Sequence, residues 1–157
     1  MPDESAHKPA LLEIAAALRE LHRSLLGVVR EEYEREVGPV GGPGHLLGLA
    51  TEHPFFAWLH PMSELIVDLD TLLDQELLPQ GTVAAVRLEV DRVSQASDLP
   101  FWGKYAPLLQ TAPEVVMSHA RLRQAMKSLP PAVKNEPLHE RRSWQTPRVH
   151  ARRGLRS

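Results

Sequence analysis

The chain reads PFFAWLHP at residues 54–61 and PFWGKYAP at residues 100–107. Both octapeptides begin with Pro-Phe, continue with a second aromatic and a small residue, and end on a second proline. Because large rigid rings bury more apolar surface than other side chains, we expect these aromatic turns to anchor the core, with Trp58 and Trp102 mostly buried. The turns hold six of the chain's eight aromatic side chains: Phe55, Phe56, Trp58, Phe101, Trp102 and Tyr105.

The segments around the turns have the spacing of amphipathic helices. Apolar residues recur at three- and four-residue intervals, and no stretch sustains the alternation of a strand. The sequence therefore predicts an all-α protein, an irregular or orthogonal bundle of five to seven helices in a single domain over residues 9–130. The residues before Pro9 and a basic tail, 131–157, are expected to be disordered. The main predicted helices cover residues 9–37, 45–51, 62–77, 82–97 and 113–129.

Composition excludes several classes of protein. With 157 residues, 43% hydrophobic and 24% charged, the chain has the make-up of one globular domain. It has no cysteine, which excludes disulfides, cysteine-ligated metals and cysteine nucleophiles. The acidic start does not fit a signal peptide, and no run approaches the ~20 apolar residues that span a bilayer. We therefore expect a cytoplasmic protein with no membrane partner.

The aromatic turns also allow a functional interpretation. Their six rings could wall a pocket for a flat apolar ligand, and His22 and His119, which lie on apolar helix faces, could line it or bind haem or a metal. We favour the structural interpretation, because aromatic clusters more often form core. Since a metal needs further ligands that the sequence does not offer, we predict no metal, no haem and no other cofactor.

A row of polar residues at four-residue steps, His60, Glu64 and Asp68, could serve a metal or an acid–base pair. We interpret the two carboxylates instead as part of a solvated acidic face. The sequence also lacks a nucleophile motif such as Gly-x-Ser-x-Gly, so we assign no catalytic residue. The buried stripe of this helix is predicted to consist of Met62, Ile66, Leu69 and Leu73, widened by Leu65 and Leu72.

The basic tail offers a possible nucleic-acid contact. Residues 134–157 carry a net charge of +5, which leaves −7 for the remainder. Arginines neutralise phosphates and an indole can stack on a base, but an acidic body repels nucleic acid. We interpret the tail as solvated and dispensable for folding. The residues of this alternative are Arg141, Arg142, Trp144, Arg148, Arg152 and Arg153.

These observations favour a non-enzymatic helical protein-interaction module that associates with itself or docks on a protein partner. One alternative is a small-molecule-binding or enzymatic helical bundle with an aromatic-lined pocket. Another is accessory nucleic-acid binding through the tail. The absence of catalytic motifs and the acidic face favour the first hypothesis over the other two.

Overall fold

The computed structural model describes residues 4–130, which fold into helices and contain no strand. The predicted all-α class and the irregular bundle are therefore confirmed. The tail at 131–157, which we predicted to be disordered, lies outside the described residues. In chain order the elements are η1 (Ser5–His7), α1 (Lys8–Glu36), α2 (Pro43–Glu52), η2 (Pro54–Leu59), α3 (His60–Leu73), α4 (Thr82–Ser94), α5 (Pro100–Tyr105), α6 (Leu108–Thr111) and α7 (Pro113–Met126), where η marks a 3-10 helix.

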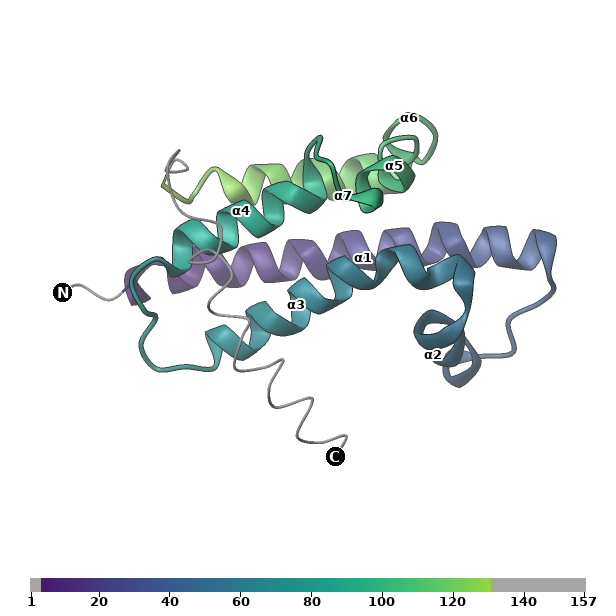
Figure 1. Ribbon diagram of the computed structural model, residues 1–157, viewed down its shortest axis with the longest axis horizontal. Helices are drawn as coiled ribbons and strands as arrows, with labels where there is room; N and C mark the ends of the chain where they lie inside the picture. The colour runs from purple at the N-terminus through teal and green to yellow at the C-terminus, as the bar shows by residue number, and fades with distance from the viewer. Residues whose placement is uncertain (1–3, 131–157) are drawn as a thin grey trace.

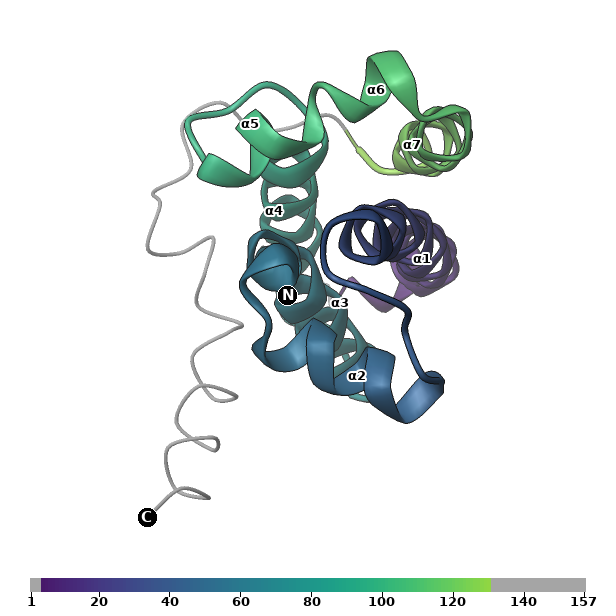
Figure 2. The same ribbon diagram turned by 90° about the vertical axis from the view of Figure 1, so that its right-hand side faces the viewer.

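Helix α1 is the spine of the bundle. Its 29 residues span about 43 Å at 1.5 Å per residue, and α7 and α3 pack along it (Figure 1). Pro9 stands in the first turn, where its missing N–H is not needed. At the other end the Tyr33 carbonyl accepts from the N–H groups of Val37 and Gly38 at 2.7 and 3.2 Å. Viewed nearly along α1, α7 lies on one side of it and α3 on another (Figure 2).

One continuous hydrophobic core joins the helices. Leu18 and Leu25 of α1 are fully buried, as are Leu69 of α3, Val90 of α4 and Leu122 of α7. These residues come from the predicted apolar stripes, so the spacing of the sequence placed most of the core. None of the helices described here combines the length and apolarity that crossing a membrane requires.

The aromatic turns form η2 and α5 and meet in the core. The ring centroids of Trp58 and Phe101 are 5.3 Å apart, which joins one turn to the other. Phe56, Phe101 and Tyr105 are buried, but Trp58 and Trp102 are only partly buried, less than we expected. Such short helices turn one side inward, and residues three or four apart share that side. The inward side therefore carries Phe56 with Leu59 and Phe101 with Tyr105.

Helix α3 is rotated relative to the predicted stripe. Its buried side chains are Met62, Leu65, Leu69 and Leu72, whereas Ile66 and Leu73 lie at the edge of the core. Asp68, three residues after Leu65 and four before Leu72, shares this buried face and is only 5% exposed. Our interpretation of Asp68 as part of a solvated acidic face is therefore wrong, although Glu64 is exposed as expected. Leu65 borders a groove that it shares with Glu89 and Val93 of α4, so α4 packs on this side of α3.

Residues 4–8 are ordered, contrary to our expectation. A carboxylate oxygen of Glu4, Oε1, accepts from the backbone N–H of Val83 at 2.7 Å, so it caps the first turn of α4 from a distant part of the chain. The Lys8 ammonium donates to the carbonyls of Gln75 and Glu76. These bonds join the N-terminal residues to the chain just after α3, which ends at Leu73, four residues before the predicted end at residue 77.

Helix α7 is held at its end by α4. The Arg87 guanidinium donates to the carbonyls of Pro130, Met126 and Leu129 at 2.7, 2.9 and 3.0 Å. The last carbonyls of a helix have no partner within the helix, and Arg87 satisfies one of them, at Met126, together with two carbonyls of the segment that follows α7. This one side chain therefore ties the end of α7 and the residues after it to α4.

Candidate functional site

One segment of the chain is almost free of charged residues, although the adjoining end of α1, residues 30–36, carries six. Residues 37–63, which we call the low-charge end, contain a single ionised residue, Glu52, in a chain that is 24% charged. The segment comprises the loop after α1, then α2, η2 and the first residues of α3. Figures 1 and 2 show α2 projecting from the bundle near the end of α1. Because the cores of protein interfaces are depleted in charged residues, this end is the strongest candidate site.

Helix α2 is apolar and yet contributes no buried residue. Leu46, Leu49 and Ala50 are partly buried against the core, and Leu47 is 69% exposed. An isolated helix of ten residues is marginal in water, and within the chain α2 packs mainly against η2. A large part of its apolar surface therefore faces solvent.

Two glycines of α2, Gly44 and Gly48, lie four residues apart on its outer side. A Cβ atom added at either position would meet no atom within 4 Å, so the packing of this chain does not require glycine there. In the interior of a helix, glycine costs about 0.5–1 kcal/mol relative to alanine. Gly48 thus lowers helix stability without a compensating contact among the described residues.

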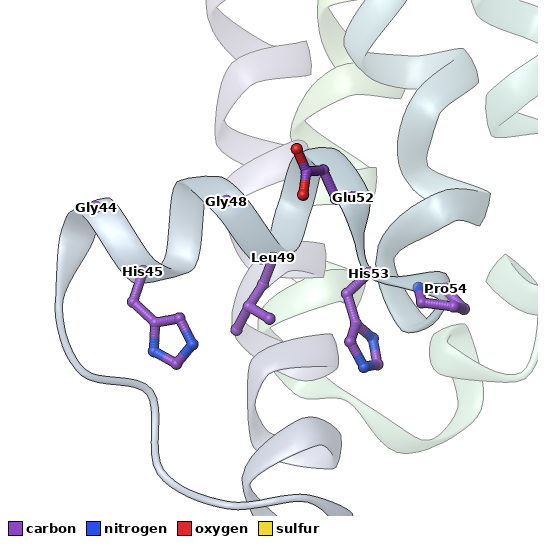
Figure 3. A pocket seen from close by; sticks show the side chains of 7 residues that line it. All are labelled: Gly44, His45, Gly48, Leu49, Glu52, His53 and Pro54. Carbon is purple, nitrogen blue, oxygen red and sulfur yellow. The ribbon is translucent and has the colours of Figure 1, made fainter.

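A groove of about 480 Å³ runs along α2. Figure 3 shows that His45, Leu49 and His53, spaced four residues apart, project from the same side of the chain, whereas Glu52 points away from them. Carbon atoms line most of the groove, and the polar side chains among its lining residues are His45, Glu52 and His53. Its lining residues are Gly44, His45, Gly48, Leu49, Glu52, His53 and Pro54.

Both groove histidines are oriented by the backbone and by one tyrosine. The Nδ1 atom of His45 accepts from the N–H of Gly41 at 2.8 Å, and that of His53 accepts from the N–H of Phe55 at 3.1 Å. When neutral, each ring therefore carries its proton on Nε2. Tyr33, from the last turn of α1, makes edge-to-face contacts with both rings, at centroid distances of 6.5 and 5.0 Å. These contacts hold both imidazole rings in defined orientations along the groove.

His22 lies outside this end, in a second groove of about 360 Å³ between α1 and α3. Its Nε2 atom is 2.7 Å from the hydroxyl oxygen of Ser63. Burial lowers the pKa of the His22 imidazole, so the ring is neutral at neutral pH. A neutral imidazole beside a serine hydroxyl has the geometry of a base and a nucleophile, a pair that the sequence analysis did not identify because 41 residues separate its members.

His119 points to a different partner. Its Nδ1 atom is 2.6 Å from the Tyr105 hydroxyl. Burial raises the pKa of Tyr105, partly offset by the Arg123 guanidinium, while burial and Arg123 both lower the pKa of His119. The tyrosine therefore keeps its proton and donates to a neutral ring. His22 and His119 hydrogen-bond in separate places, His22 to α3 and His119 to α5.

These two histidines predict a pH dependence of stability. A histidine in the unfolded chain titrates near about pH 6.5, and the folded-state pKa values of His22 and His119 are lower. The unfolded state therefore binds more protons just below that pH, so the free energy of unfolding should fall as the pH is lowered. Urea denaturation at about pH 7.5 and about pH 5.5 should show this loss, and the double variant His22→Gln/His119→Gln should lose less. Equal losses in both proteins would contradict the prediction.

The structure brings the predicted site residues together only in part. One cluster of tilted and edge-on rings consists of Trp58, Phe101, Trp102, Tyr105 and His119. The rings of Phe55 and Phe56 instead contact Tyr33 at the low-charge end. Within residues 4–130, no three histidine or carboxylate side chains are grouped so as to hold a metal. That His22 and His119 bind none stays a prediction. The nucleic-acid alternative lies outside the described residues, at Arg141, Arg142, Trp144, Arg148, Arg152 and Arg153.

The sequence analysis did not identify the low-charge end, because sequence motifs consist of chemical groups and this segment is marked by their absence. A single ionised residue in positions 37–63 is visible in the sequence. What the sequence does not show is that α2 lacks buried residues. Comparisons with protein-family models, with curated proteins and with solved structures found no match.

Proposed function

We propose that the chain is a non-enzymatic helical protein-interaction module and that its contact face is the low-charge end. One observation carries the proposal: α2, an apolar helix, has no buried residue and leaves Leu47 69% exposed. Exposed apolar surface that adjoins a groove is typical of interaction sites.

Two further features support this face over the rest of the surface. Of the other large exposed apolar side chains, Val37 belongs to the same segment, whereas residues such as Leu77 after α3 and Met117 on α7 lie outside it. Exposed residues scattered in this way need no explanation. In contrast, the groove on α2 is lined by Leu49 and Pro54 together with His53, whose ring packs edge-to-face on Tyr33. A rigid face loses little conformational entropy on binding.

Photo-crosslinking tests the proposal. A photoreactive phenylalanine analogue replaces Leu47 in the full-length protein, and irradiation in an extract of the native cells should yield adducts with a small set of proteins. Each protein identified by mass spectrometry is then purified and titrated calorimetrically against wild type and Leu47→Glu. We expect the variant to bind at least about tenfold more weakly, equivalent to about 1.4 kcal/mol.

The matched control places the same analogue at Met117, which is 73% exposed on α7, and uses Met117→Glu in the titrations. Adducts from both positions, or equal affinities for Leu47→Glu and wild type, would contradict the proposal. A small molecule retained by the protein in native mass spectrometry and lost in His53→Ala would favour the ligand-binding alternative instead.

A second candidate function rests on the 2.7 Å contact of Ser63 with His22. In ester hydrolysis the Ser63 oxygen would attack the carbonyl carbon while His22 takes the hydroxyl proton and returns it to the leaving alkoxide; water would then release the acyl group. A fluorophosphonate probe should label wild type and neither Ser63→Ala nor His22→Gln. Absence of labelling in wild type would reject this candidate.

A further inference from the structure

We infer that the groove between α3 and α4 is a docking site for the basic tail of the same chain. The segment assigned to it is residues 141–148, which reads RRSWQTPR. Its arginines pair with the carboxylates of the groove, and Trp144 packs on the apolar lining. This inference replaces our interpretation of the tail as solvated. It does not rest on the proposed function, because the carboxylates of the groove lie outside the low-charge end.

Charge complementarity identifies the tail as the occupant. Residues 60–99, which include α3 and α4, carry eight carboxylates and two arginines, a net charge of −6. The tail at 134–157 carries +5. Helices α3 and α4 contact each other, and both lie to the left of α1 in Figure 2. Because regions of opposite potential attract one another, the face formed by these two helices attracts the tail.

The groove combines carboxylates with an apolar lining. Glu64 of α3 and Glu89 of α4 border it together with Arg92, which lies 3.5 Å from the Glu89 carboxylate. Asp68 follows Glu64 by about one turn on the same side of α3 and is only 5% exposed. Three carboxylates and one guanidinium leave the groove negative, and arginine binds carboxylates through paired hydrogen bonds. The apolar lining residues are Pro61, Leu65, Val93 and Leu99.

The size of the groove fits a side chain rather than a free small molecule. Its volume of about 200 Å³ is below the ~300–1,000 Å³ typical of small-molecule sites. In the tail, Trp144 stands between Arg142 and Arg148. One short segment therefore supplies both a large ring for the apolar lining and guanidinium groups for the carboxylates.

The tail begins within reach of the groove. The described chain ends at Pro130, whose carbonyl accepts from the Arg87 guanidinium of α4 at 2.7 Å, and Glu89 lies two residues further along the same helix. Arg141 is 11 residues beyond Pro130, a span of up to about 36 Å, which exceeds the ~10–12 Å diameter of a helix. A tethered segment has an effective concentration in the millimolar range. The tail therefore competes well for this groove against basic segments of other proteins.

Paramagnetic relaxation enhancement in the full chain tests the inference. Because the sequence has no cysteine, Thr146→Cys provides a unique attachment point for a nitroxide. Among residues 4–130, the label should broaden the amide signals of 64–68 and 89–93 most strongly. A second sample mixes isotope-labelled protein without nitroxide and nitroxide-labelled protein without isotopes. The broadening should disappear in this mixture, because the tail docks on its own chain.

Charge-reversal variants test which residues are responsible. Arg141→Glu/Arg142→Glu should shift the docking equilibrium toward the undocked state by at least about tenfold. The matched control in the tail, Arg152→Glu/Arg153→Glu, makes the same change of charge outside the docking segment and should keep the broadening.

On the bundle, Glu64→Arg at the exposed rim of the groove should weaken the broadening. Glu31→Arg, an equal change at an exposed position of α1, should leave it unchanged. Broadening spread evenly over the described helices, or reduced equally by each variant and its control, would overturn docking in this groove. Broadening that persisted in the mixed sample would show that the groove takes the tail of another copy, which would overturn the assignment to the same chain.

Discussion

Replacing Phe56 by alanine should lower the free energy of unfolding by about 3–5 kcal/mol. The Phe56 ring is fully buried, and its centroid lies 6.3 Å from the centroid of the Tyr33 ring, where η2 meets the end of α1. Because a domain of this size is stable by only about 5–15 kcal/mol, the variant should be close to unfolding. Urea denaturation followed by circular dichroism measures the loss.

The controls for this experiment come from the same part of the molecule. Trp102→Ala should cost less, since the indole is only partly buried, and Leu47→Ala should change stability by less than about 0.5 kcal/mol, as expected for an exposed position. A Phe56→Ala protein of normal stability that no longer bound its partner would show that this ring serves binding rather than folding.

The second large effect is expected at Arg87. Arg87→Met keeps most of the side-chain stem but removes the three donated hydrogen bonds to Met126, Leu129 and Pro130. Each bond from a charged donor contributes about 1.5–3 kcal/mol, and the three are not additive because they share one guanidinium. We expect a total loss of at least about 2 kcal/mol in urea denaturation.

Arg87→Lys tests whether geometry or charge matters. A lysine ammonium is a compact charge without the planar fork of arginine, so it should restore only part of the lost stability. Hydrogen exchange should also quicken at the end of α7 in Arg87→Met before it does so in α1. Full recovery by lysine would contradict the argument from geometry.

The ends of α1 and α7 illustrate what local sequence can predict. Pro9 and Pro113 begin these helices, and α1 ends just before Gly38 and Pro39. Backbone restrictions of proline and glycine act within a few residues, whatever the rest of the chain does. Both ends of α1 were therefore predicted to within one residue, and so was the start of α7, whereas α7 ends at Met126, three residues before the predicted end.

Asp68 illustrates what local sequence cannot predict. The apolar residues of α3 allow a stripe through Ile66 and Leu73 or one through Leu65 and Leu72, and spacing alone does not distinguish them. The second is buried because α4 covers that side. A contact between residues far apart also orders the chain around Glu4, because the Glu4 carboxylate caps α4 at Val83, 79 residues away.

The same distinction between local sequence and tertiary contacts holds for the candidate site. The sequence by itself determined that residues 37–63 carry almost no charge and that a short apolar helix lies among them, because charge and helical spacing are properties of neighbouring residues. Only the tertiary structure decided that this helix lies on the surface with Leu47 exposed, and that His22 faces Ser63. Burial depends on which helices pack together, and that packing minimises the apolar surface of the whole chain rather than of any one segment.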